Sequence, residues 1–214
     1  DAADPFHDSA DLSGRAGSDL KMGLGPNLTL DATVNPDFGQ VEADPAEVNL
    51  SAFETFFSER RPFFTEGSQL LNGNGANYFY SRRIGAPPPG VANGDFVDFP
   101  RTSTILGAAK VTGRLANGTS LGVLSALTDR EFAAVSTGGM RDRIKVASRT
   151  GYGVLRAQQE FGAAKSTVGL SLTGVSRDLG AGDAFADRVT RHAHSGGGDW
   201  LLRFTITGDE AFWE

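Results

Sequence analysis

Two glutamates, Glu42 and Glu66, are the side chains of this sequence best suited to acid–base chemistry. Hydrolysis of a glycosidic bond uses two carboxyl groups: one, with a raised pKa, protonates the leaving group, and the other acts as base or nucleophile. The chain contains 26 acidic residues, so a pair of this kind is easily found by chance. Glu42 and Glu66 are therefore weak catalytic candidates, and the sequence favours a protein without enzymatic activity over a hydrolase acting on glycosidic bonds.

A metal site has less support still. His192 and His194 are two residues apart and would point to one face of a strand, but no third ligand lies near them in the sequence. Two solvated loop histidines explain this spacing better. The chain has no cysteine, which excludes thiol nucleophiles, disulfides and zinc–thiolate sites, and it has no Gly-x-Ser-x-Gly motif. We predict neither a metal nor a cofactor.

The elements that would carry these residues are strands in which apolar and polar residues alternate. Residues 28–35 place Leu28, Leu30, Ala32 and Val34 on one parity, and residues 200–207 repeat the pattern. In a strand, such alternation puts the apolar side chains on one face. Segments of about ten residues with this period are typical of strands that span a bilayer in a closed barrel, because lipid offers no hydrogen-bond partners.

Alternation and turn residues together predict eight strands, at 16–24, 28–35, 77–84, 103–114, 119–128, 149–161, 166–176 and 198–208. Three connections are tight turns, at 25–27, 116–118 and 162–165, and the others are long. Short turns on one rim and long loops on the other are typical of bacterial outer-membrane barrels. Two successive long connections, 36–76 and 85–102, conflict with strict up-and-down topology, so we expect either a further crossing between 36 and 102 or one long connection on the opposite rim.

Composition agrees with a β-rich membrane protein. The 28 glycines and 15 phenylalanines fit tight turns and aromatic anchors, and no run of about 18 apolar residues is present that could form a membrane-spanning helix. The net charge of −6 argues against a nucleic-acid partner. Aromatic residues near strand ends are expected to form two interfacial girdles, with ordinary core packing as the alternative: Tyr78, Phe79, Tyr80, Phe99, Tyr152, Phe161, Trp200, Phe212 and Trp213.

Three stretches carry a resemblance to a known family: residues 31–67, with the motif Phe-Phe-Ser-Glu-Arg-Arg-Pro-Phe-Phe, then Tyr80-Ser-Arg-Arg-Ile-Gly85, and residues 105–113. The chain resembles the bacterial domain-of-unknown-function family 5916 (DUF5916) from about Ala16 to Phe204. This resemblance implies a C-terminal membrane β-barrel that, in longer relatives, follows a module similar to carbohydrate-binding family 9. It implies no catalytic residue, and we expect the module to lie upstream of the present sequence.

The middle segment, 36–76, is predicted to be an ordered insert in the lumen or at the mouth, because its many phenylalanines would be unnecessary in a solvated linker. A short helix would begin at Asn49 or Ser51 and end at Pro62. The residues expected to define the insert are Asp37, Phe38, Gln40, Glu42, Asp44, Phe53, Glu54, Arg60, Arg61, Phe63 and Glu66. Its acidic groups would pair with lumen-facing arginines or, less favourably, attract cations or polyols; the arginines are Arg82, Arg83, Arg114 and Arg203.

We therefore predict an all-β chain: a partial, antiparallel, up-and-down transmembrane β-barrel over residues 16–214, with residues 1–15 as a linker from an upstream module. The expected location is the bacterial outer membrane, and the expected partners are the lipid bilayer and an oligosaccharide or polysaccharide bound through that module. The barrel would act as a pore, a translocation path or a surface anchor. The alternatives are an enzyme associated with glycoside hydrolysis and a soluble β-sandwich that binds a ligand.

Overall fold

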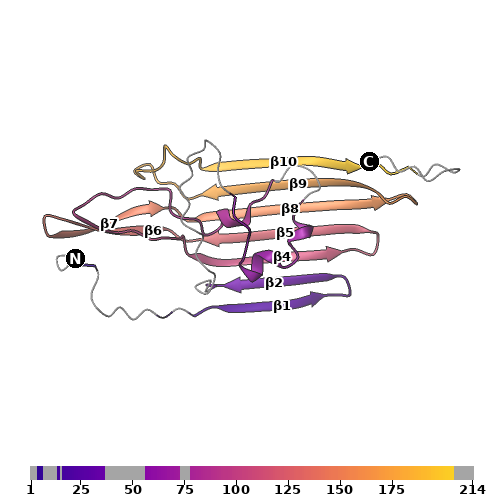
Figure 1. Ribbon diagram of the computed structural model, residues 1–214, viewed down its shortest axis with the longest axis horizontal. Helices are drawn as coiled ribbons and strands as arrows, with labels where there is room; N and C mark the ends of the chain where they lie inside the picture. The colour runs from indigo at the N-terminus through magenta and orange to yellow at the C-terminus, as the bar shows by residue number, and fades with distance from the viewer. Residues whose placement is uncertain (1–3, 7–13, 15, 37–55, 73–77, 205–214) are drawn as a thin grey trace.

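The computed structural model of the chain describes residues 4–6, 14, 16–36, 56–72 and 78–204 (Figure 1). Its larger sheet has seven antiparallel strands in the order β1-β2-β4-β5-β8-β9-β10. These strands are β1 (Ser18–Leu24), β2 (Leu28–Val34), β4 (Ile105–Arg114), β5 (Thr119–Thr128), β8 (Thr150–Phe161), β9 (Ser166–Arg177) and β10 (His192–Leu201). Among the described strands, β1 and β10 are the two edges of the sheet, and no pairing joins them.

A smaller sheet of three strands lies beyond one end of the larger one. It has the order β3-β6-β7, formed by β3 (Phe96–Asp98), β6 (Glu131–Thr137) and β7 (Met140–Ala147). The β6–β7 hairpin turns at Gly138 and Gly139, whose φ angles of 58° and 80° are both positive. Two such residues form the turn whose twist matches that of a hairpin, and glycine adopts it without strain. The connection between β5 and β8 is long, as predicted, but it forms this hairpin and is not an irregular loop.

Three short helical elements lie over one face of the larger sheet (Figure 1): α1 (Pro62–Thr65), η1 (Ser68–Leu70) and η2 (Ser81–Arg83). We call residues 56–72 and 78–86 the covering segment. The sequence predicted that Pro62 would end a helix, but Pro62 is the first residue of α1. Proline suits this position because the first turn of a helix does not use the backbone N–H that proline lacks. The predicted helix start at Asn49 or Ser51 lies outside the described residues.

The strand predicted at 77–84 is absent from the described residues 78–84. Its alternating aromatic residues instead pack on the sheet, and Ser81–Arg83 form a turn in which the N–H of Ile84 donates to the carbonyl of Ser81. When residues 77–84 are not counted as a strand, every long connection between the seven strands lies on one rim and every tight turn on the other, as their register requires. The conflict over topology came from counting 77–84 as a crossing.

The register defines two faces. The inner face carries Lys110, Leu124, Val154 and Thr173, which lie opposite one another across neighbouring strands. The outer face carries the alternate residues of the same strands. The core lies between the inner face and the covering segment: Phe64, Leu71 and Ile84 pack there against Leu124, Ala126 and Val154. At Gly122, a Cβ atom would come within 2.2 Å of the Leu70 carbonyl oxygen, so this glycine permits the backbone of η1 to touch the sheet.

Candidate functional site

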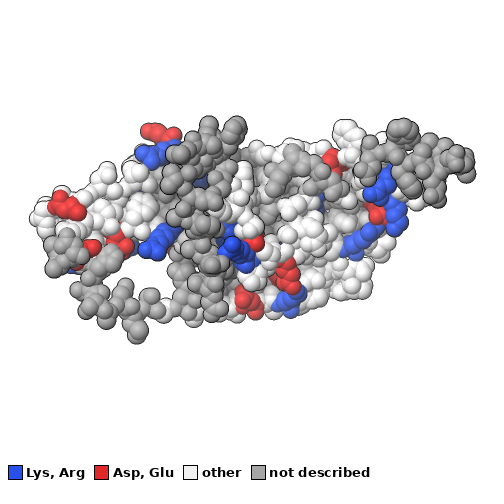
Figure 2. All heavy atoms as spheres, viewed as in Figure 1, with Lys and Arg blue, Asp and Glu red and all other residues white. Residues whose placement is uncertain are grey.

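The charged residues of the seven strands all lie on the inner face. They are Asp19, Lys21, Asp31, Lys110, Arg114, Arg156, Glu160, Arg177 and Asp199. Figure 2 is viewed from the side of the covering segment and shows basic and acidic groups intermixed over this face. The charged side chains thus keep to the face opposite the apolar rows. The inner face therefore needs partners for buried charge; two groups of contacts supply them, and a third joins the two parts of the covering segment.

The first group joins β1, β2 and β4 to the covering segment. Lys110 is 1% exposed, and its ammonium group lies 3.7 Å from Asp31 and donates to the backbone carbonyls of Phe63 and Glu66. Those carbonyls belong to the C-terminal end of α1, where helix carbonyls lack partners and favour a cation. On β1, Lys21 binds the carboxylate of Glu66. Residues from three strands thus hold α1 in place.

The second group lies near the edge strand β10. The guanidinium group of Arg156 on β8 is buried and donates to Asp199 on β10, with Nη2 lying 2.9 Å from Oδ1. It also donates to Ser171 at 3.1 Å and to Gln158 at 2.9 Å. The guanidinium packs over Gly169, where any Cβ atom would lie within 2.4 Å of it. This contact fixes the position of β10 through a charge-assisted, two-point hydrogen bond.

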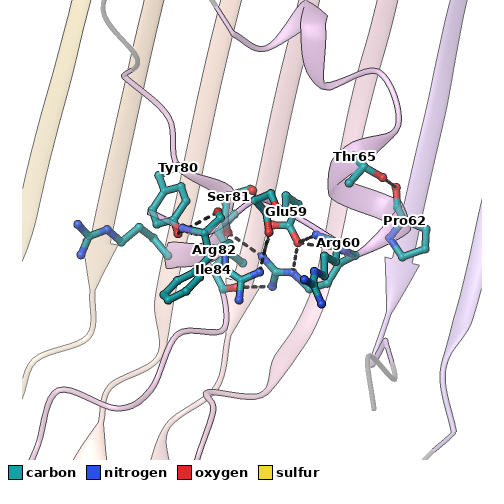
Figure 3. Close-up of polar contacts among 12 residues, drawn as sticks. Glu59, Arg60, Pro62, Thr65, Tyr80, Ser81, Arg82 and Ile84 are labelled. Atoms are coloured by element: carbon teal, nitrogen blue, oxygen red, sulfur yellow. Dashed lines mark hydrogen bonds and ion pairs between the residues drawn. The ribbon is translucent and has the colours of Figure 1, made fainter. Parts of the chain in front are cut away.

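The third group closes the covering segment on itself (Figure 3). Glu59 accepts hydrogen bonds from Nε and Nη2 of Arg61, at 2.8 and 2.7 Å, and from the Ser81 hydroxyl at 2.6 Å. Arg61 in turn donates to the carbonyls of Ser81 and Ile84, and its guanidinium group lies 4.2 Å from the centre of the Phe64 ring. We call Glu59, Arg61, Ser81 and Ile84 the clasp.

The charge state of Glu59 follows from these contacts. Burial alone would raise its pKa, but the hydrogen bonds from Arg61 and Ser81 stabilise the carboxylate and lower the pKa to about 2. A second link strengthens the clasp: the Tyr80 hydroxyl bridges the N–H and the carbonyl of Phe57. Glu59 is therefore ionised at neutral pH and serves as a hydrogen-bond acceptor, which is a structural role.

The outer face is apolar along whole rows. One row crosses all seven strands as Met22, Leu30, Val111, Val123, Leu155, Leu172 and Gly196. These side chains are not sealed under a second layer: Met22 and Leu172 are each 45% exposed, and Leu170 in the adjacent row is 46% exposed. Soluble monomers rarely expose so large a continuous apolar surface. No helix of the described residues is long and apolar enough to span a membrane.

The residues of the inner face, the clasp and the outer face are spread along the chain from β1 to β10. Over residues 2–194, the sequence matches the family described as a domain of unknown function, DUF5916. The chain belongs to the DUF5916 family. No match was found among curated proteins or among solved structures. The clasp lies in the two stretches, 56–64 and 80–85, that carried the resemblance in the sequence, and both fall within the matched residues.

The predicted insert residues of this DUF5916 chain are partly described. Arg60, Arg61, Phe63 and Glu66 lie in the covering segment. Those outside the described residues are Asp37, Phe38, Gln40, Glu42, Asp44, Phe53 and Glu54. Of the predicted lumen-facing arginines, Arg82 and Arg83 lie in η2, and Arg114 on β4 pairs with Glu160 at 3.0 Å. Arg203 follows β10 and donates to the Lys165 carbonyl at 3.4 Å.

The catalytic candidates gain no geometric support. Glu66 is exposed and bound to Lys21, which lowers its pKa, whereas a general acid needs a raised one. Glu42 lies outside the described residues. His192 and His194 lie on β10 and not in a loop, and His192 contacts the Ser176 hydroxyl. Within the described part of the chain, no three residues of the types that ligate metals come together.

The prediction of aromatic girdles is wrong for four residues. Phe79 and Tyr152 pack against the core, Tyr80 belongs to the covering segment, and the Tyr78 ring lies against Gly197 on the inner face. Phe161 and Trp200 are on the outer face at the tight-turn rim and are 46% and 73% exposed. Phe99 lies in a connecting segment, and Phe212 and Trp213 fall outside the described residues.

Of the clasp, the sequence pointed only to Arg61, and it also missed Lys110 and the Arg156–Asp199 pair as site residues. A signal for the last two existed, because a charged residue within an otherwise apolar or small-residue strand marks a position that needs a partner. The contact between Glu59 and Ser81 had no comparable signal, since these residues are 22 positions apart and only the fold brings them together.

Proposed function

We propose that this chain forms the lipid-facing wall of an outer-membrane β-barrel whose interior is occupied by the covering segment, and that it acts as a membrane anchor and not as an open pore. The observation that carries this proposal is the separation of surfaces: an exposed, charge-free apolar outer face and an inner face that holds every charged residue of the seven strands. A lipid-facing strand surface needs this separation, since charge is costly at mid-bilayer.

Strand length agrees with this role. β4, β5 and β10 have 10 residues each, and β8 and β9 have 12, against about 9–11 residues for a tilted strand that spans the hydrocarbon core. β1 and β2 are shorter, with 7 residues each. Trp200 and Phe161 lie at the tight-turn end of the outer face, where barrels place aromatic side chains at the membrane interface. The two edges would be paired by further strands, because an unpaired edge is not stable in lipid.

The role of anchor follows from the filled inner face. The covering segment packs Phe64, Leu71 and Ile84 against the sheet and is held there by the clasp and by Lys110. A pore would need an inner surface open to water along the whole strand. We therefore expect the full-length protein to show no steady ion conductance in planar bilayers, and a large steady conductance would favour the pore instead.

The absence of cysteine allows a direct test of the membrane role. Ser125 is exposed on the outer face, and Asn117 is exposed in a tight turn. In permeabilised outer-membrane fragments, a water-soluble maleimide should label Asn117→Cys rapidly and Ser125→Cys only after unfolding. Rapid labelling of Ser125→Cys in the folded protein, or recovery of the full-length protein in the soluble fraction without detergent, would refute the proposal and favour a soluble protein.

A further inference from the structure

A cavity of about 470 Å³ lies between the inner face and the covering segment, at the rim of the long connections. Its floor is formed by β8 and β9, with Tyr152 and Val175. The covering segment supplies Tyr78 and Arg83, and the connection between β9 and β10 supplies Val189. This volume lies within the range of about 300–1,000 Å³ that is usual for small-molecule sites.

The charge of the cavity is one-sided. Among the described residues that line it are two arginines, Arg83 and Arg177, and no aspartate or glutamate, although the chain as a whole has a net charge of −6. Asp178 and Asp183, in the adjacent connection, pair with Arg130 and Lys145. The site is therefore electropositive within an acidic protein, which selects an anion.

Arg177 has hydrogen-bonding capacity left for a ligand. Its Nη1 atom donates to the Thr190 carbonyl at 2.8 Å, and no carboxylate of the described residues forms an ion pair with it. A guanidinium group has five N–H donors, so others remain. By contrast, the Tyr152 and Ser148 hydroxyls are already engaged, with the Arg83 carbonyl and with Asp183. Because Arg177 keeps free N–H donors, its guanidinium group can bind a carboxylate or phosphate at two points.

We infer that this cavity binds a small organic anion in which one carboxylate or phosphate group is attached to a flat apolar or aromatic body. Arg177 holds the anionic group, and the body lies among Tyr78, Tyr80, Tyr152 and Phe79. Aromatic side chains favour a flat partner that can stack or meet them edge to face. The inference concerns the inner face and does not depend on what surrounds the outer face.

The test uses three probes of one shape and different charge: 2-naphthoate, 2-naphthamide and 2-naphthamidine. Binding to the detergent-purified full-length protein is measured by equilibrium dialysis against protein-free micelles. We expect 2-naphthoate to bind once per chain, 2-naphthamide at least about tenfold more weakly, and 2-naphthamidine no more than to micelles alone. Equal binding of the three probes, preference for the cation, or no binding of any probe would overturn the inference.

Variants locate the site. Arg177→Gln should weaken 2-naphthoate binding by about tenfold and leave 2-naphthamide binding unchanged, because only the charged contact is lost. Arg188→Gln is the matched control: it removes the same charge from an exposed residue of the same connection that does not line the cavity. Val189→Trp should abolish binding of both probes by filling the cavity. Unchanged 2-naphthoate binding in Arg177→Gln would assign the anion to another place and refute the proposed site.

Discussion

Replacement of Leu172 by arginine is the sharpest test of what the outer face contacts. Leu172 lies in the middle of β9, within an apolar row that crosses the whole sheet, and it is 45% exposed. If this face meets lipid, arginine at mid-bilayer should lower the free energy of unfolding by about 2–4 kcal/mol. If it meets water, the cost should be about 1 kcal/mol or less, because roughly half of the side chain is already exposed and arginine can extend into solvent.

A control at the end of a strand separates the two environments. Val34 is also on the outer face, but it is the last residue of β2 and is 62% exposed. Val34→Arg should cost about 0–1 kcal/mol in lipid, because the penalty falls towards the interface, and a similar amount in water. Urea unfolding of the full-length protein in lipid vesicles gives both values. Equal costs for Leu172→Arg and Val34→Arg would refute the argument that the outer face is buried in a bilayer.

Three further outcomes are expected. Hydrogen bonds hold the pKa of Glu59 at about 2, against an ordinary 4.5, so its carboxylate contributes about 3 kcal/mol of stability. This contribution is present in full above about pH 4.5 and is lost as the pH falls towards 2. Urea unfolding across this pH range should show the loss in the native protein and not in Glu59→Gln. Gly122→Val should force η1 from the sheet at a cost of about 1–3 kcal/mol and speed hydrogen exchange at Leu70, whereas Gly153→Val, with open space at its Cβ, should not. Lys110→Met should cost about 1–3 kcal/mol in unfolding experiments by leaving the α1 carbonyls without a donor, and equal stability of the variant would contradict the role given to this lysine.

The sequence predicted six of the strands closely, because alternation and tight turns are local properties of the chain. β1, β2, β4, β5, β8 and β9 lie within a few residues of the predicted ranges. β10 begins at His192, earlier than predicted, since Gly196, Gly197 and Gly198 have no side chains through which a period of two can be seen. The β6–β7 hairpin carried a local signal in Gly138-Gly139 that a long-loop interpretation overlooked.

The false strand at 77–84 has a different cause. Tyr78 and Tyr80 alternate as in a strand, but alternation reports only that one side of a segment is buried and not what buries it. Here the inner face of the sheet does so, and the backbone of this segment finds other partners: the N–H of Ile84 and Nη2 of Arg61 both donate to the Ser81 carbonyl. Propensity and period cannot distinguish pairing with a strand from packing on one.

The clasp and the charged inner face depend on each other. A sheet can pair its own neighbours, as Lys21, Asp31 and Lys110 do across three strands, but it cannot supply acceptors above its surface. The covering segment brings these acceptors, the carbonyls at the end of α1, and it can present them only if its two halves are joined. Glu59 and Arg61 make that join. The clasp is therefore best understood as the means by which a polar inner face is satisfied, and this leaves the opposite face of the strands free of aspartate, glutamate, lysine and arginine.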